Sequence, residues 1–219
     1  GYFESEIAVF QNIKESDFVV VIGLGKTGLS VTRFLQGKGI KTVLMDTRAC
    51  PPNLKLIDTE KFLAVICGRI DFKFLEASKK IILSPGLSKS QIGINLLVEF
   101  PEKVISDIDL FSAYCRSPII GVTGTNGKTT VTTIISSMLS LAGYNVLSGG
   151  NIGEPALNLL SQTVPDFYIL ELSSFQLELF QQVKLEIGVL LNISPDHLDR
   201  HESFSRYIRI KHRILECSK

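Results

Sequence analysis

The chain has 219 residues, 45% of them hydrophobic, with 23 basic and 22 acidic residues and a formal net charge of +1. This length suffices for one large domain or two modest ones with ordinary buried cores. Charges of both signs are interspersed, which gives no electrostatic case for binding nucleic acid or an anionic membrane.

Hydropathy and cysteine spacing bear on where the protein works. No apolar run approaches the roughly 18 residues needed to span a bilayer, and the polar start of the chain is unlike a signal peptide. The four cysteines form no CxxC pair, so neither a zinc knuckle nor a dense disulfide framework is indicated. We therefore expect a globular protein of the reducing cytoplasm.

Short apolar runs alternate with helix-like segments, a pattern typical of parallel α/β units rather than of a β-sandwich. The runs are continuously apolar, as is typical of buried parallel strands. We expect strands at residues 18–22, 41–45, 81–83, 118–122, 167–170 and 187–191. We expect helices at residues 29–36, 106–114, 131–142 and 204–215, and two domains, residues 1–114 and 115–219.

The last predicted helix, residues 204–215, places apolar side chains mostly on one face with basic residues between them. Surface helices carry charged outer faces. We therefore interpret Arg206, Arg209 and Arg213 as solvated.

The first glycine-rich motif, GLGKTG at residues 23–28, follows the first predicted strand and opens the first helix. In this context a GxGxxG loop lets backbone N–H groups approach a diphosphate, whose charge the helix N-terminus favours. Asp46 ends the second strand, where a dinucleotide fold places the acid that binds a ribose. Alone, this combination indicates an NAD-dependent enzyme; the alternative is a glycine turn needed only for packing.

The second motif, GTNGKT at residues 124–129, keeps the GK[ST] ending of a P-loop, although Val122 stands where the general pattern has its first glycine. Lys128 is placed to meet β- and γ-phosphates, and the hydroxyl of Thr129 can bind Mg²⁺. Two anion-binding loops of different types favour a nucleotide-driven enzyme with a nucleotide-linked substrate over a dehydrogenase, which needs only the first loop.

Three polar clusters follow in apolar surroundings, at residues 149–153, 171–176 and 192–201. Ligands bind at the carboxyl ends of parallel strands. Glu171 is therefore a candidate Mg²⁺ ligand if its strand lies beside the P-loop strand; the alternative is an exposed strand-end acid. His197 remains open between a metal ligand, a phosphate partner and a helix cap.

Together and in this order, these motifs resemble those of the Mur ligase family of peptidoglycan synthesis. The resemblance spans nearly the whole chain and implies an N-terminal Rossmann-like parallel-sheet domain followed by part of a P-loop ATPase α/β domain. The motifs that carry it are GLGxTG at 23–28, DTR at 46–48, SPG at 84–86, the P-loop, GNIG at 150–153, LELSSFQLE at 170–178 and DHLDR at 196–200.

The resemblance implies that the first domain binds the UDP part of UDP-N-acetylmuramoyl-L-alanine and no NAD. Lys26 departs from the family, which has an apolar residue there, and is either an added phosphate contact or a solvated side chain. The substrate-binding residues implied are Gly25, Lys26 and Thr27 for the diphosphate, Asp46, Thr47 and Arg48 for the uridine, Gly86 in the same site, and Asn151 and His197 in the second domain.

The resemblance also implies an ATP site and two Mg²⁺ sites in the second domain. With CO₂ added, a lysine becomes a carboxylate-like anion that suits a hard cation; without the resemblance, Lys211 would be interpreted as a solvated helix lysine. The ATP-binding residues implied are Gly124, Thr125, Asn126, Gly127, Lys128, Thr129 and Thr130. The metal ligands implied are Thr129, Glu171, His197 and carbamylated Lys211, and the catalytic residues are Lys128, His197 and Lys211.

The implied reaction is an ATP-driven addition of D-glutamate to UDP-N-acetylmuramoyl-L-alanine. The substrate carboxylate takes the γ-phosphoryl group to form an acyl phosphate, and the amine of D-glutamate then displaces phosphate. The family has a third domain that receives the amino acid, and this chain ends at Lys219, inside the ATPase domain. We therefore expect the chain alone to bind the UDP-substrate without ligating D-glutamate. The exposed sheet edge of the incomplete domain is a candidate surface for association; the alternatives are a proteolytic or engineered piece and the product of a split or decaying gene.

Three alternatives stay open at this point. The first is another amide ligase of the family, with a different acceptor amino acid. The second is an NAD-dependent oxidoreductase, which rests on GxGxxG and Asp46 alone. The third is a UDP-sugar-binding remnant that shows binding without ATP turnover.

Overall fold

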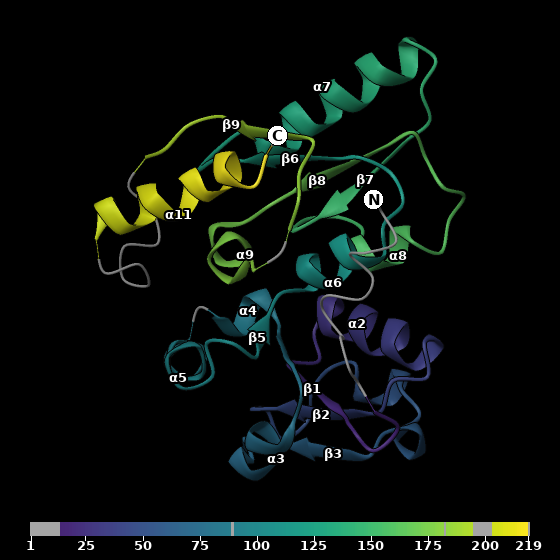
Figure 1. Ribbon diagram of the computed structural model, residues 1–219, viewed down its shortest axis with the longest axis vertical. Coiled ribbons are helices and arrows are strands. Elements are labelled where there is room, and N and C mark those ends of the chain that lie inside the picture. The colour runs from purple at the N-terminus through teal and green to yellow at the C-terminus, as the bar shows by residue number, and fades with distance from the viewer. Residues whose placement is uncertain (1–13, 89, 182, 195–202, 219) are drawn as a thin grey trace. The chain divides into compact units, whose positions relative to one another are not determined.

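The structure, a computed structural model, describes residues 14–88, 90–181, 183–194 and 203–218. The chain divides into two compact units, the first ending at Asp107 and the second beginning at Ile108 (Figure 1). The helix Asp107–Tyr114, α6, thus falls almost entirely in the second unit, whereas the sequence analysis assigned it to the first domain. Each unit holds one parallel sheet, which confirms the predicted α/β class.

The first unit is built on a five-stranded sheet in the order β3-β2-β1-β4-β5, with every neighbouring pair parallel. The apolar runs of β1 and β2 are buried along their whole length. The strands are β1 Val19–Ile22, β2 Thr42–Asp46, β3 Ala64–Cys67, β4 Ile81–Leu83 and β5 Val104–Ile105. The helices are α2 Lys26–Gly37, α3 Phe72–Ala77, α4 Pro85–Ser88 and α5 Gln91–Glu99, with 3₁₀ turns at Leu54–Leu56 and Thr59–Lys61.

The strand order of the first unit locates its ligand-binding edge. The chain adds β2 and β3 on one side of β1 and then crosses to β4 and β5 on the other side. The carboxyl ends of β1 and β4 therefore form a topological switch point, where doubly wound sheets bind ligands. The glycine loop at residues 23–28 follows β1, and Ser84 and Gly86 follow β4.

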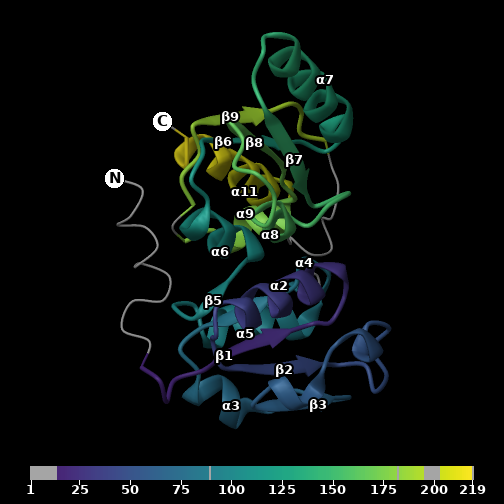
Figure 2. The same ribbon diagram turned by 90° about the vertical axis from the view of Figure 1, so that its right-hand side faces the viewer.

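The second unit is built on a four-stranded sheet in the order β7-β8-β6-β9, again with every neighbouring pair parallel. Figures 1 and 2 show α7 on one side of this sheet and α9 and α11 on the other. The strands are β6 Ile119–Thr123, β7 Val146–Gly150, β8 Phe167–Glu171 and β9 Ile187–Leu190. The helices besides α6 are α7 Lys128–Leu141, α8 Ala156–Leu159, α9 Ser174–Leu179 and α11 Phe204–Glu216.

Helix α7 covers its side of the sheet with apolar side chains spaced four residues apart. Val131, Ile135 and Leu139 pack against a buried cluster of Ile120, Val122 and Ile169 from β6 and β8. This packing fixes the start of α7 directly above the carboxyl ends of these strands. Within the described part of the chain, no helix has the length and apolar character needed to cross a membrane.

The sequence predicted most elements closely. All six predicted strands agree with the structure to within one residue at each end. The strands β3, β5 and β7 were missed, because β3 is only half-buried, β5 has two residues and β7 ends in a serine and two glycines. Helices α2 and α7 begin three residues earlier than predicted, because the last residues of both glycine motifs already form the first helical turn.

Candidate functional site

The glycine loop of the first unit turns the chain from β1 into α2. Gly23 has a left-handed backbone (φ +98°), and a side chain on Gly28 would clash with the carbonyl oxygen of Gly23, so both positions require glycine. Gly25 immediately precedes α2 and has open space around its Cα, so an anion can approach the backbone there. This geometry suits the diphosphate contacts expected of Gly25, Lys26 and Thr27, which stay a prediction.

The loop after β4 meets the glycine loop at the switch point. A Cβ added to Gly23 would lie 2.9 Å from the Cβ of Ser84, so the two loops are in contact. Gly86, the remaining residue expected in the UDP site, lies in α4 two residues further on. The structure thus brings the loops after β1 and β4 together at one edge of the sheet.

Asp46 at the end of β2 fastens the glycine loop to Arg48. Its carboxyl is only 2% exposed, and Oδ2 accepts from Leu24 N–H at 2.7 Å and from Arg48 Nη2 at 2.7 Å. Oδ1 accepts from the backbone N–H of Arg48 at 2.8 Å and from its Nε at 2.9 Å. Burial alone would raise the pKa of Asp46, but the bonds from Arg48 and Leu24 outweigh it and hold this pKa below its ordinary value. Asp46 therefore acts as a positioning residue.

A cavity of about 370 Å³ lies beside Thr47, the middle residue of the DTR motif. The loop after β3 and helix α5 supply most of its wall, including two polar side chains, Arg69 and Asn95. The sequence analysis missed both, because it predicted neither β3, which precedes the loop of Arg69, nor α5, which carries Asn95. The lining residues are Thr47, Gly68, Arg69, Ile70, Phe72, Ile92 and Asn95.

The P-loop of the second unit connects β6 to α7. Gly127 has a left-handed backbone (φ +83°), which lets the loop turn directly into the helix. The first hydrogen bond of α7 runs from Val131 N–H to Gly127 O, so the N–H groups of Lys128, Thr129 and Thr130 have no partner within the helix. Lys128 Nζ donates to Gly124 O at 2.9 Å, which holds the ammonium over the loop.

Glu171 lies beside the P-loop, as the sequence predicted for neighbouring strands. Strand β8 pairs with β6, and Thr129 Oγ1 lies 3.2 Å from Glu171 Oε1 and 3.1 Å from Oε2. The carboxyl is 3% exposed, so the alternative of an exposed acid is wrong. Among the described residues no cluster of three or more His, Cys, Asp or Glu side chains could hold a metal. The pair of hard oxygen ligands suits Mg²⁺, which completes its shell with phosphate and water.

Lys211 of α11 is buried against the P-loop rather than solvated, so its interpretation without the resemblance is wrong. Its side chain is 2% exposed, and Nζ donates to Thr123 Oγ1 at 2.8 Å and to Gly124 O at 3.1 Å. Nζ also lies 5.6 Å from the ring centroid of Tyr207, within cation–π range. The expected partner His197 lies outside the described residues, as does the rest of the DHLDR motif.

Two residues of the site were not predicted as functional. Tyr207, assigned only to the apolar face of its helix, is 1% exposed and its hydroxyl lies 3.0 Å from Thr125 Oγ1. Asn192, in the third polar cluster, hydrogen-bonds the backbone of Thr125 and Asn126. Asn151 lies near the same strand ends, since its N–H donates to Glu171 O at 2.8 Å.

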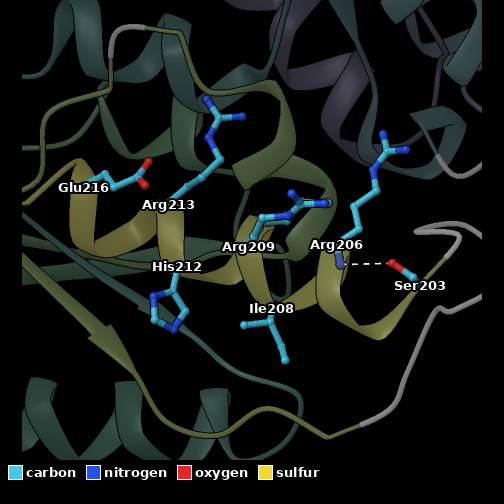
Figure 3. A pocket seen from close by; sticks show the side chains of 8 residues that line it. Ser203, Arg206, Ile208, Arg209, His212, Arg213 and Glu216 are labelled. Carbon is cyan, nitrogen blue, oxygen red and sulfur yellow. Dashed lines mark hydrogen bonds between the residues drawn. The ribbon is translucent and has the colours of Figure 1, made fainter.

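The basic residues of α11 surround a cavity of about 740 Å³ (Figure 3). Arg206 pairs with Glu178 at 3.1 Å, and Arg213 donates to the carbonyl oxygens of Glu178 and Phe180. These two arginines, both partly exposed, therefore also hold the end of α9, which their interpretation as solvated side chains did not anticipate. Arg209 is exposed, as expected.

Comparison with known proteins agrees with this arrangement in both units. The profile described as Mur ligase MurD-like, N-terminal domain, matches residues 17–106, and the profile of the Mur ligase middle domain matches residues 122–219. The chain belongs to the Mur ligase family. The family resemblance drawn from the motifs is confirmed.

Two curated relatives show how much of the Mur ligase length the chain represents. A protein of Nitrosococcus oceani named UDP-N-acetylmuramoylalanine--D-glutamate ligase is 44% identical over 196 residues, which are 89% of this chain and 43% of that protein. One of the same name from Pseudomonas fluorescens is 40% identical over 208 residues, 94% of this chain and 46% of that protein. The chain therefore spans less than half the length of these relatives.

A solved structure supports the fold. The UDP-N-acetylmuramate:L-alanyl-gamma-D-glutamyl-meso-diaminopimelate ligase of Neisseria meningitides superposes with a TM-score of 0.55 at 16% identity. The match covers 93% of this chain and 68% of that protein.

Proposed function

We propose that this chain carries the UDP-substrate site and the ATP site of a ligase that joins D-glutamate to UDP-N-acetylmuramoyl-L-alanine through an acyl phosphate. The observation that carries the proposal is the convergence of Lys128, the Thr129–Glu171 pair and buried Lys211 on one P-loop. D-glutamate, rather than another acceptor, is supported by the names of relatives at 40–44% identity.

The proposed chemistry needs alignment and charge neutralisation more than covalent help from the protein. In the first step the carboxylate of UDP-N-acetylmuramoyl-L-alanine attacks the γ-phosphorus of ATP, and the bond to the ADP oxygen breaks. Lys128 offsets the negative charge that spreads over the phosphoryl oxygens, while the first N–H groups of α7 hold the phosphates. In the second step the amine of D-glutamate attacks the acyl carbon, phosphate leaves and the amine loses a proton.

Thr129 and Glu171 would hold Mg²⁺ in this proposal. The ion supplies positive charge to the phosphate oxygens when it is bound. His197 and carbamylated Lys211 are proposed for the second metal. Lys211 Nζ now donates to two oxygens. A carbamate keeps a single N–H on Nζ, so one of these two bonds would be lost, and its carboxylate oxygens would face away from the carbonyl of Gly124.

We infer that the uridine of the substrate lies in the cavity beside Thr47. Its volume of about 370 Å³ is typical of small-molecule sites. Asn95 Oδ1 accepts from Gln91 Nε2 at 2.9 Å, so Asn95 offers its NH₂ group, and Arg69 offers further N–H donors. N–H donors suit the two carbonyl oxygens of uracil, and the apolar wall suits its ring.

The NAD alternative loses its main support at Asp46. A carboxylate has about four lone-pair sites, and four protein N–H donors already bond to this one. No acceptor is left for the ribose hydroxyl of a dinucleotide.

Calorimetric titration of the chain tests the proposal. We expect UDP-N-acetylmuramoyl-L-alanine and a Mg²⁺-bound ATP analogue to bind, and NADH not to bind. Tight NADH binding without UDP-substrate binding would overturn the proposal. Binding of both substrates with no hydroxylamine-trapped acyl phosphate from ATP would favour the non-catalytic alternative. The cytoplasmic location and the association through the edge of the second sheet stay predictions, the latter tested by analytical ultracentrifugation.

A further inference from the structure

The segment after β9 is bonded to the P-loop through Asn192. Asn192 Oδ1 accepts from the backbone N–H of Thr125 at 3.0 Å and of Asn126 at 2.9 Å, and Nδ2 donates to the carbonyl oxygen of Asn126 at 2.8 Å. The carbonyl oxygen of Asn192 accepts a further bond from Thr125 N–H at 3.2 Å. One side chain thus satisfies both backbone polar groups of Asn126.

Ser194 extends this connection on the same segment. Its N–H donates to Thr125 Oγ1 at 3.0 Å. The hydroxyl of Tyr207 reaches the same Oγ1 from α11 at 3.0 Å. Thr125 and Asn126 are therefore fixed by groups of the second unit that lie more than 65 residues further along the chain.

These bonds divide the P-loop into two halves. Each backbone N–H donates one strong hydrogen bond, so the donors of Thr125 and Asn126 are engaged by protein. The N–H groups of Lys128, Thr129 and Thr130 precede the first helical bond of α7 and remain as donors for a ligand. Asn192 itself is exposed, so burial alone does not account for its ordered contacts.

We propose that Asn192 is a positioning residue for nucleotide binding. It holds the Thr125–Asn126 half of the P-loop in place, so that the first-turn N–H groups of α7 and the ammonium of Lys128 face the phosphates. Asn192 acts through the loop and not on the ligand. The inference rests on the proposed ATP site.

The test compares Asn192→Ala with Asn145→Ala, the same substitution at an exposed position before β7, at the opposite edge of the same sheet. We expect the affinity for Mg²⁺-ADP to fall about tenfold to a hundredfold in Asn192→Ala, since three side-chain bonds are lost. Asn145→Ala should bind as the unchanged chain does. Without nucleotide, amide exchange at Thr125 and Asn126, followed by NMR, should accelerate only in Asn192→Ala.

Asn192→Asp separates positioning from a general structural role. The carboxylate keeps both acceptor bonds and loses the donor to Asn126 O, so amide protection at Thr125 and Asn126 should be largely restored. Unchanged or tighter Mg²⁺-ADP binding in a folded Asn192→Ala would overturn the proposal; tighter binding would mean that Asn192 covers the phosphate site. If Asn192→Ala does not fold, amide exchange in the unchanged chain tests the proposal, because unprotected amides at Thr125 and Asn126 would contradict the hydrogen bonds from Asn192. If the unchanged chain binds no ADP, the proposed ATP site is refuted. The amide-exchange test of the bonds from Asn192 to the P-loop can still be carried out.

Discussion

Replacing Asp46 by Asn tests whether this carboxyl holds the proposed UDP site together. An amide presents one acceptor oxygen in place of two, so two of the four donors around Asp46 lose their partners. If the amide nitrogen of the substituted side chain takes the position of Oδ2, the buried N–H of Leu24 faces another donor. If it takes the position of Oδ1, the backbone N–H and Nε of Arg48 face another donor.

The size of the effect follows from burial. A buried donor left without an acceptor costs about 1–3 kcal/mol. The ion pair adds little, because the Arg48 side chain is 50% exposed, and an exposed pair contributes about 0.5 kcal/mol. We expect Asp46→Asn to lower the free energy of unfolding of the first unit by about 2–3 kcal/mol, a large share of the roughly 5–15 kcal/mol typical of a domain.

Urea-dependent amide exchange, read separately on peptides of the two units, measures this change. The control is Asp58→Asn, because Asp58 is exposed and caps a 3₁₀ turn, a role that Asn fills equally well. Its ion pair with Lys61, at 4.0 Å between exposed side chains, contributes little. Affinity for UDP-N-acetylmuramoyl-L-alanine should fall in Asp46→Asn, whereas ATP-analogue binding in the second unit should not change. A loss of stability below about 0.5 kcal/mol, the range of ordinary surface substitutions, together with unchanged UDP-substrate affinity would refute the reasoning.

Three further predictions concern Asp46, Glu171 and Lys211. The pKa of Asp46 is lower in the folded chain than in the unfolded chain. The ionised carboxyl therefore stabilises the fold above the unfolded-state pKa of about 4, and this stabilisation is lost as the pH falls through the folded-state pKa. When the pH is lowered below about 4, the urea concentration at the unfolding midpoint of the first unit should fall, and it should fall less in Asp46→Asn. Glu171→Gln should weaken Mg²⁺-ADP binding about tenfold and leave metal-free ADP binding unchanged, because a charged metal ligand is lost; equal losses in calorimetry with and without Mg²⁺ would contradict the metal role. A ¹³C carbamate resonance should appear under labelled CO₂ and vanish in Lys211→Met; the same resonance in the variant would rule out Lys211 as its source.

Sequence reasoning succeeded where the signal is local. The apolar runs of β1, β2, β6 and β8 predicted buried parallel strands, because a strand covered on both faces has no polar face to encode. The same physics explains the miss of β3, whose residues are all half-buried. Because β3 was not predicted, Arg69 and the cavity beside Thr47 were also missed.

The assignment of Asp46 shows a different limit. The sequence predicted that Asp46 ends a strand at the carboxyl edge of the sheet, and the structure places it there. The position could not show that Leu24 and Arg48 use its acceptor capacity, because that depends on the fold of a loop 22 residues away. An aspartate at this position suits either a ribose-binding acid or a residue that positions the glycine loop, and only its hydrogen-bond partners distinguish the two roles.

The P-loop shows why its motif does not determine its own shape. Glycine and threonine side chains bury too little apolar surface to order a loop, so the order must come from hydrogen bonds. Those bonds come from Glu171 of β8, from Asn192 after β9, and from Tyr207 and Lys211 of α11, at sequence separations of 42 to 87 residues. The conformation of the P-loop is therefore a property of the assembled carboxyl edge of the sheet, and we expect nucleotide affinity to respond to substitutions of residues that do not contact the nucleotide.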